Sequence, residues 1–305
     1  MARLLILPLL AALLLSTAAC SSEAERRRID FGETEPIAPV DTGEESGAIL
    51  RIAFAGVISP KETLKTYESL LSYIGRQFHR SVEIVQRETY AEINDLVESL
   101  DVDLAFVCSL AYVVGNDDFG MELLAVPEVN GETTYHSYII VSATSDIHFL
   151  DDLRGKTFAF SDPLSNSGRL APTYRLYRIG ETPEAFFERV SFTYSHDRSI
   201  RAVADGLVDG AAVDSLVYDF IVAAEPEIAA QTRIIEISDP FGIPPVIVHP
   251  GLDPEIKARL RELFLGLDED TEGSQILDDL MIDRFVVGDD AAYDSIRSRV
   301  RELGW

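Results

Sequence analysis

The stretch "AILRIAFAGVISPKETLKTYESLLSYIGRQFHRSVEIVQRETYAEINDLVESLDVDLAFV", residues 48–107, decides the fold. Its apolar residues form short runs typical of buried strands, and they follow a helical spacing between those runs. In chain order we expect a strand, a helix, a strand, a helix and a strand over residues 48–57, 62–79, 81–88, 90–100 and 102–107. This order predicts an α/β fold with a parallel sheet that helices cover on both faces.

The same alternation continues toward the C-terminus. Further strands are expected at 135–143, 157–160, 187–195, 210–215, 232–238 and 244–251, and further helices at 171–178, 199–208, 216–226, 253–267, 272–281 and 292–303. Long extended connections join two such α/β units, which favours two lobes with a cleft between them. Ligands of open α/β sheets bind beyond the carboxyl ends of the strands, so a site just after Phe160 would face this cleft.

The first residues form a predicted export signal. Arg3 is followed by an apolar run and then by small residues up to Cys20, a pattern typical of a signal peptide over residues 1–19 and too short for a spanning helix. The ending Ala-Ala-Cys resembles a bacterial lipobox, although Thr17 stands where a leucine is usual. We expect acylation of Cys20, with plain secretion as the alternative. Residues 20–47 are then the anchor site and a disordered tether.

Charge and motifs exclude several classes of function. The 305 residues include 52 acidic and 26 basic side chains, a net charge of −26, which argues against nucleic acid and anionic membrane surfaces as partners. Cys108 has no disulfide partner once Cys20 is assigned to the anchor, and it is expected to be a small buried hydrophobe. The sequence carries no metal-ligand or nucleotide-binding motif, so neither metal nor cofactor is expected. Ser195, His196 and Asp197 are neighbours on an extended segment and point to opposite faces, so they are no catalytic triad and no catalytic residue is predicted.

A small polar turn, Ser165–Gly168, follows the strand at 157–160 and precedes a helix. Such a turn either caps the helix through a serine side chain or presents free N–H groups and neutral donors to an anion. An aspartate there would occupy those donors and repel the anion, so neutral residues suit an anion site. Asp214, at the tip of the strand at 210–215, likewise has two readings. It either accepts a hydrogen bond from a protonated ligand oxygen or only caps the next helix.

Several stretches, taken together and in order, resemble the PhnD-like family of substrate-binding proteins of ABC importers for phosphonate, phosphite or phosphate. The resemblance covers about residues 50–296, and its stretches are "DLAFVCSLAY", "YHSYIIVS", "LRGKTFAFSDPLSNSGRLAP", "SHD", "DGLVDGAAVDS" and "DPFGIPPVIVHPGL". It implies a two-lobed periplasmic-binding-protein type II fold, with a hinge and a cleft between the lobes. Lobe 1 would comprise residues 48–140 and 245–305, and lobe 2 residues 141–244, with hinge strands near 138–144 and 242–249.

The resemblance also implies a set of ligand-binding residues. The phosphoryl oxygens would lie on the turn formed by Ser165, Asn166, Ser167 and Gly168, where Asn166 stands in place of the threonine usual in the family. A histidine donor falls on His196, whose contribution we expect to weaken at high pH, and aromatic positions fall on Tyr90, Tyr112 and Tyr135. Arg169 is expected to be solvated. The loop at 241–246 lacks the acid that relatives binding aminoalkyl phosphonates carry, which argues against an aminoethyl ligand.

These observations predict an extracytoplasmic, membrane-anchored receptor that delivers a small phosphorus oxyanion to the membrane subunits of an ABC permease. We expect a monomer without enzymatic activity. The alternative is a sensor of the same fold that feeds a membrane signalling kinase. An extracytoplasmic hydrolase lacks a nucleophile–base pair in this sequence.

Overall fold

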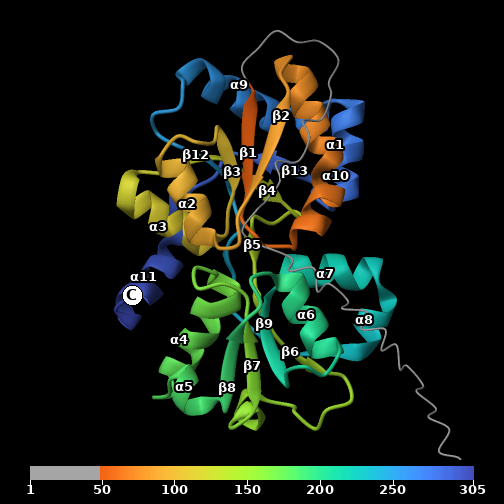
Figure 1. Cartoon of the computed structure of the whole chain (residues 1–305), viewed down its shortest axis with the longest axis vertical. Coiled ribbons are helices and arrows are strands. Elements are labelled where there is room, and N and C mark those ends of the chain that lie inside the picture. The colour runs from red at the N-terminus through yellow and green to blue at the C-terminus, as the bar shows by residue number, and fades with distance from the viewer. Residues whose placement is uncertain (1–48) are drawn as a thin grey trace, which may run out of the picture. The chain divides into compact units, whose positions relative to one another are not determined.

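The computed structural model describes residues 49–305, so the predicted signal peptide, Cys20 and the tether lie outside the described residues. The described residues belong to one compact unit built on two mixed sheets (Figure 1). Among them, no helix is both long and apolar enough to cross a membrane.

The first sheet has the order β13-β4-β12-β3-β1-β2. Its strands are β1 (Leu50–Phe54), β2 (Val82–Gln86), β3 (Leu104–Phe106), β4 (Glu122–Glu128), β12 (Val246–Val248) and β13 (Arg284–Val286). β2, β1 and β3 are parallel, as predicted from residues 48–107, whereas β12 enters antiparallel to β3 and β13 runs antiparallel to β4. Helices α1 and α10 lie on one side of this sheet and α2 and α3 on the other (Figure 1). The bounds of its helices are α1 (Pro60–Phe78), α2 (Tyr90–Glu98), α3 (Ser109–Phe119), α9 (Pro254–Leu265), η3 (Leu267–Glu269) and α10 (Thr271–Leu280).

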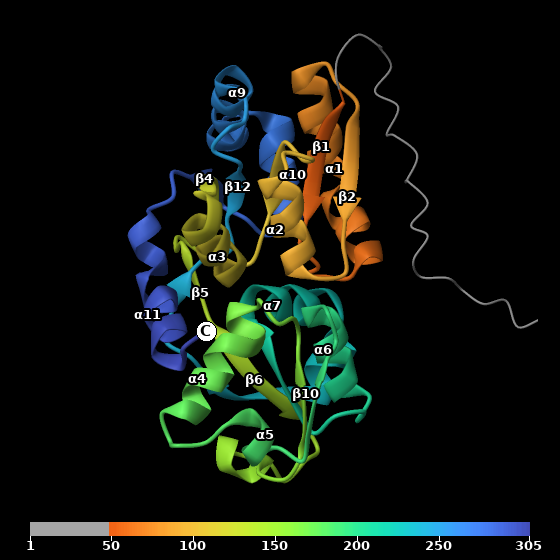
Figure 2. The ribbon, with the colours of Figure 1, turned by 60° about the vertical axis from the view of Figure 1, so that its left-hand side comes forward.

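The second sheet has the order β10-β6-β9-β7-β8. Its strands are β6 (Ser137–Ser142), β7 (Thr157–Phe160), β8 (Arg189–Phe192), β9 (Gly210–Asp214) and β10 (Thr232–Ile237). β8, β7 and β9 are parallel, β6 is antiparallel to β9, and β10 is antiparallel to β6. Its helices are η1 (Leu150–Leu153), η2 (Asn166–Leu170), α4 (Ala171–Tyr177), α5 (Pro183–Phe186), α6 (His196–Ala204), α7 (Ser215–Ala224) and α8 (Pro226–Gln231). Helices α4 and α5 lie on one side of the sheet and α6 on the other (Figure 2).

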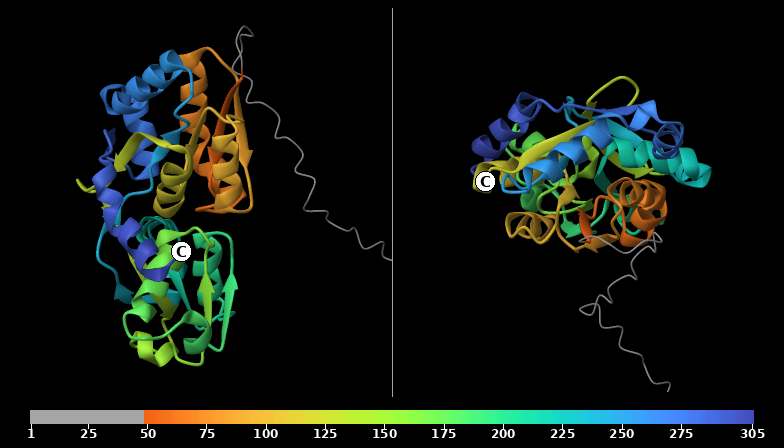
Figure 3. Two further views of the ribbon diagram at one scale, coloured as in Figure 1. Left: turned by 90° about the vertical axis from the view of Figure 1, so that its left-hand side faces the viewer. Right: turned by 90° about the horizontal axis from the view of Figure 1, so that it is seen from above.

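The chain crosses between the sheets at a short antiparallel pair, β5 (Thr134–Tyr135) with β11 (Phe241–Gly242). The crossing therefore comes before β6, and the predicted hinge at 138–144 lies instead inside the second sheet. The sequence gives no break at this point, because only His136 separates β5 from β6. After η4 (Asp290–Tyr293), helix α11 (Asp294–Leu303) packs against both α3 and α4 (Figure 3).

Candidate functional site

The predicted polar turn is a π-helical turn, η2, that runs on into α4. Ser165 is its N-cap, because Ser165 Oγ accepts a hydrogen bond from the Gly168 N–H at 3.0 Å. The Ser137 hydroxyl donates to the Ser167 carbonyl at 2.6 Å and so ties the turn to β6. The helix cap, one of the two interpretations of this turn, is thus present. The hydroxyl hydrogen of Ser165 can still donate to a further acceptor. π-Helical turns are rare and occur frequently at functional sites.

A close approach explains the glycine of this turn. A Cβ on Gly168 would lie 1.8 Å from Ser161 Oγ and 2.9 Å from Ser165 Oγ. Ser161 directly follows β7 and is fully buried. A side chain at position 168 would therefore displace two serine hydroxyls that each lie 3.4 Å from His196 Nε2.

His196, the first residue of α6, is a fully buried neutral imidazole. Burial lowers its pKa to about 3. Its Nδ1 accepts a hydrogen bond from the Asp214 N–H at 3.0 Å, which assigns the ring proton to Nε2. The Nε2–H group is therefore a donor directed at the serine hydroxyls. A neutral imidazole keeps this N–H at alkaline pH. The prediction that the contribution of His196 to binding weakens at high pH is therefore wrong.

Two further predicted residues, Tyr90 and Tyr135, lie close to this turn. Tyr90 is the first residue of α2, and its N–H donates to Asp162 Oδ2 at 3.2 Å. Asn166 Nδ2 donates to Tyr135 Oη at 3.0 Å. Burial, with the Cys108 thiol nearby, raises the pKa of Tyr90 and of Tyr135 well above the ordinary value, so both hydroxyls stay protonated.

Six buried side-chain polar atoms have no hydrogen-bond partner among residues 49–305, and three of them belong to this region: Tyr90 Oη, Ser167 Oγ and Asn166 Oδ1. The other three are Asn94 Oδ1, Thr173 Oγ1 and Ser195 Oγ. A buried hydroxyl without a partner is costly, and native structures rarely leave one unexplained. We call the set Tyr90, Tyr135, Ser161, Ser165, Asn166, Ser167 and His196 the polar cradle; each of these side chains is at most 1% exposed.

Asp214 lies beside the polar cradle and caps α7. Its Oδ1 accepts hydrogen bonds from the N–H groups of Leu216 at 2.8 Å and Val217 at 3.4 Å. Burial raises the pKa of this carboxyl to about 7. The capping role left open by the sequence is thus present in the structure.

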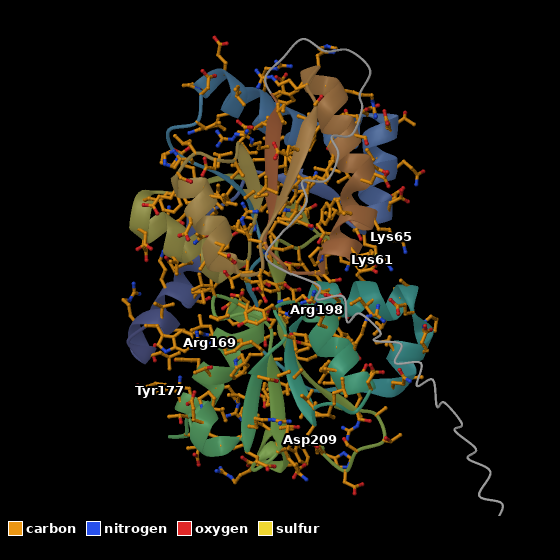
Figure 4. The ribbon with its side chains drawn as sticks, viewed as in Figure 1. Lys61, Lys65, Arg169, Tyr177, Arg198 and Asp209 are labelled. Carbon is orange, nitrogen blue, oxygen red and sulfur yellow. The ribbon has the colours of Figure 1, made fainter. Side chains whose placement is uncertain are left out.

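Two predicted features lie elsewhere. The Tyr112 hydroxyl donates to Asp290 at 2.6 Å, so the structure does not bring it to the polar cradle. Arg169 is only partly exposed, unlike the solvated side chain expected; its guanidinium lies 4.2 Å from the Trp305 ring centroid and donates to a backbone carbonyl (Figure 4).

Sequence reasoning did not place three residues of this region at the site: Ser161, Asp162 and Cys108, the last of which was expected only to be a small buried hydrophobe, and is buried. The Asn166 N–H donates to Cys108 Sγ at 3.4 Å, and burial raises the pKa of that thiol to about 11. All three residues come within two positions of the end of a strand, β7 or β3, and this position is the signal that could have found them.

Hydrogen bonds between the two lobes cover the polar cradle. The His196 N–H donates to the Val57 carbonyl at 2.9 Å, and the Ser59 N–H donates to Asp197 Oδ1 at 2.8 Å. These bonds join the two lobes at the start of α6, next to the polar cradle.

Basic side chains lie at the same junction. Lys61 and Lys65 on α1 and Arg198 on α6 are exposed and lie where the helices of the two lobes meet (Figure 4). On a chain of net charge −26, these are three positive charges near the junction of the lobes. Within the described residues, no group of three or more His, Cys, Asp or Glu side chains could hold a metal ion.

Two mixed sheets, joined by a pair of crossing strands with a buried polar site between them, define a two-lobed periplasmic binding protein. The sequence profile described as "ABC transporter, phosphonate, periplasmic substrate-binding protein" matches residues 52–293, and the chain belongs to this family. Membership confirms the fold class, and it confirms that the chain is a binding protein and not an enzyme. The description as periplasmic implies an extracytoplasmic location.

Individual relatives agree with this assignment. The chain is 30% identical over 210 residues to the phosphate-import protein PhnD of Mycolicibacterium smegmatis, covering 65% of each chain. It is 26% identical over 196 residues to the phosphonates-binding periplasmic protein of Escherichia coli, covering 63% of this chain and 58% of that protein. These matches thus span less than two thirds of either relative. The crystal structure of a binding protein component of an ABC phosphonate transporter from Pseudomonas aeruginosa superposes with a TM-score of 0.79 at 25% identity, over 83% of this chain and 86% of that one.

Proposed function

We propose that this protein binds a small phosphorus oxyanion (phosphate, phosphite or a phosphonate) in the polar cradle and delivers it to an ABC permease. The observation that carries the proposal is the pair of buried, unpartnered hydroxyls of Tyr90 and Ser167 in the polar cradle, where the hydroxyls of Ser161 and Ser165 lie 3.4 Å from His196 Nε2. An oxyanion held there would accept from these groups and so remove the cost of leaving them unpaired.

The chemistry of the polar cradle suits a phosphoryl group. Its donors are hydroxyls, an imidazole N–H and an amide, and none carries a formal charge, so binding depends on several charge-assisted hydrogen bonds at once. Asn166 can take part because the Tyr135 hydroxyl both donates and accepts. If the side-chain amide of Asn166 flips, so that its oxygen and nitrogen exchange places, the Tyr135 hydroxyl donates to Asn166 Oδ1. Asn166 Nδ2 is then free to donate to the anion.

Delivery to a permease requires a second state. We infer that the lobes separate about β5 and β11 to admit the ligand and close over it, because every side chain of the polar cradle is at most 1% exposed in this structure. We further propose that the protein acts as a monomer, and that acylated Cys20 holds it at the membrane. Replacement of Cys20 by alanine should then release the protein from the membrane fraction. A variant that remains membrane-bound would contradict the anchor.

Calorimetry with phosphate, phosphite, methylphosphonate and 2-aminoethylphosphonate tests the binding function. Tyr90→Phe deletes a proposed donor, and we expect it to weaken binding of the best ligand about 10- to 100-fold, the loss of one hydrogen bond to a charged group. Tyr112→Phe is the matched control, because that hydroxyl is bonded to Asp290. Absence of binding to all four compounds, or equal losses in both variants, would overturn the proposal.

A further inference from the structure

The loop that joins β1 to α1, residues 55–59, lies against the start of α6 in the other lobe. The His196 N–H donates to the Val57 carbonyl at 2.9 Å, and the Ser59 N–H donates to Asp197 Oδ1 at 2.8 Å. The two bonds run in opposite directions between neighbouring pairs of residues. Both are therefore lost together when the loop moves away from α6.

Asp197 depends on this contact for its hydrogen bonding. The residue is 4% exposed, and among residues 49–305 its carboxylate accepts a hydrogen bond from Ser59 alone. Arg201, one turn further along α6, attracts the carboxylate but directs its own hydrogen bonds to Glu225, at 2.7 and 2.9 Å. A buried carboxylate is costly unless it is paired, whereas a carboxylate in water is not. Asp197 thus has the Ser59 N–H as its partner when the lobes are closed and water when they separate.

Gly56 allows the loop to approach the other lobe this closely. A Cβ at this position would lie 3.1 Å from the Tyr194 carbonyl oxygen, across the boundary between the lobes. The nearest atoms of its own lobe, the carbonyl oxygens of Glu88 and Arg87, would lie at 3.7 and 3.9 Å, an ordinary van der Waals distance. A methyl group at position 56 would therefore be crowded only while the lobes are closed.

A second aspartate of the same lobe is placed in the same way. Asp162 is 1% exposed, and its Oδ2 accepts a hydrogen bond from the N–H of Tyr90, the first residue of α2. The first N–H groups of a helix have no partner within the helix, so they must find one elsewhere. At the starts of α1 and α2, one such N–H group is satisfied by a carboxylate from the other lobe.

We propose that Gly56, Ser59 and Asp197 form a latch that holds the lobes closed, and that this latch sets the affinity and lifetime of the bound state without touching the ligand. The inference rests on the proposed function. The apparent affinity of a ligand falls in proportion to the fraction of protein that can adopt its binding state. A weaker latch should therefore lower the affinity for every ligand by one common factor.

Calorimetry of Gly56→Ala with phosphate, phosphite, methylphosphonate and 2-aminoethylphosphonate tests the inference. Crowding in the closed state should weaken binding about 5- to 100-fold, by the same factor for each compound that the wild type binds. Wild-type affinity in the variant, or a factor that differs from one compound to the next, would overturn the inference. Absence of binding of all four compounds to the wild type would instead count against the proposed function.

Gly266→Ala is the matched control. A Cβ at Gly266 would lie 3.2 Å from the Glu262 carbonyl oxygen, a contact as close as that of Gly56, but both residues belong to the end of α9 in one lobe. Its crowding is the same whether the lobes are open or closed, so this variant should keep the affinity of the wild type even where it loses stability. Equal losses of affinity in Gly56→Ala and Gly266→Ala would show that the fold and not the latch is affected, and the inference would fail.

Asp197→Ala removes the hydrogen-bond acceptor of the latch. Loss of a hydrogen bond to a charged group should weaken binding about 10-fold, and stopped-flow kinetics should show the loss as faster release and not as slower association. Glu227→Ala is the control, because Glu227 is an exposed acid in the first turn of α8. Wild-type affinity in Asp197→Ala, or a loss confined to association, would contradict the latch.

Discussion

Replacement of Asp214 by asparagine should remove a pH-dependent loss of stability. Burial raises the pKa of this carboxyl from 3.8 to about 7. The folded protein therefore keeps the proton up to about pH 7, whereas the unfolded chain releases it near pH 4. Because the native state binds more protons in this window, the free energy of unfolding contributed by Asp214 falls as the pH rises from about 4 to about 7.

The shift of about three pKa units corresponds to about 4 kcal/mol. An asparagine oxygen can accept the same hydrogen bonds from Leu216 and Val217, so the cap of α7 should survive in Asp214→Asn. Relative to wild type, the free energy of unfolding of the variant should therefore rise by about 4 kcal/mol between pH 4 and pH 8.

Urea titrations followed by circular dichroism at unit steps of pH would measure this difference. Subtraction of the wild-type curve cancels carboxyls common to both proteins, such as Asp162, whose pKa burial also raises. Asp253→Asn is a matched control for the loss of a capping carboxylate, because Asp253 caps α9 through two backbone N–H groups but is exposed. Parallel pH profiles for Asp214→Asn and wild type would refute the reasoning.

Three further outcomes are expected. The contribution of His196 to ligand affinity should not change from pH 6 to pH 9, because its lowered pKa of about 3 keeps it a neutral donor throughout. Isothermal titration calorimetry of the wild type and of His196→Ala at each pH measures this contribution. A ratio of the two affinities that varies with pH would contradict the expectation. Gly168→Ala should lower the free energy of unfolding by about 1–3 kcal/mol and weaken phosphate binding. Ser161→Gly in the same chain should restore part of the stability but not the binding, because Ser161 belongs to the polar cradle; unrestored stability would show that the clash at 1.8 Å is not the cause. Thr89→Ala breaks the capping box before Tyr90 and should cost about 1 kcal/mol in a thermal or urea melt, whereas an unchanged midpoint would show that the cap contributes nothing.

The sequence predicted most of the regular structure, because strands and helices differ in the period of their apolar residues. It did not predict α3, Ser109–Phe119, whose residues are apolar on several sides and therefore lack a helical stripe. It also missed β13, Arg284–Val286, within a tail expected to be helical. A strand this short is defined by its pairing with β4, a contact between residues far apart in the sequence.

The candidate site shows the same limit. The turn Ser165–Gly168 is contiguous, so its chemistry could be read directly from the residues. Tyr90 and Tyr112 looked equivalent, because both lie near the junction of a strand with a helix. Tyr90 is the first residue of α2 and lies at the polar cradle, while Tyr112 lies one turn into α3 and reaches Asp290. The phase of a side chain on its helix decides between these outcomes, and it depends on where the helix begins.

Helix α11 bears on how such a protein should be handled. Arg297 donates to Asn116 on α3 at 3.0 Å, and Glu302 accepts from Tyr174 on α4 at 2.9 Å. Separation of the lobes as proposed above would strain or break one of these attachments, so we expect α11 to act as a brake that slows ligand exchange. A reporter or affinity tag joined beyond Trp305 would disturb that brake, and stopped-flow release rates of tagged and untagged protein should differ even where their folds agree.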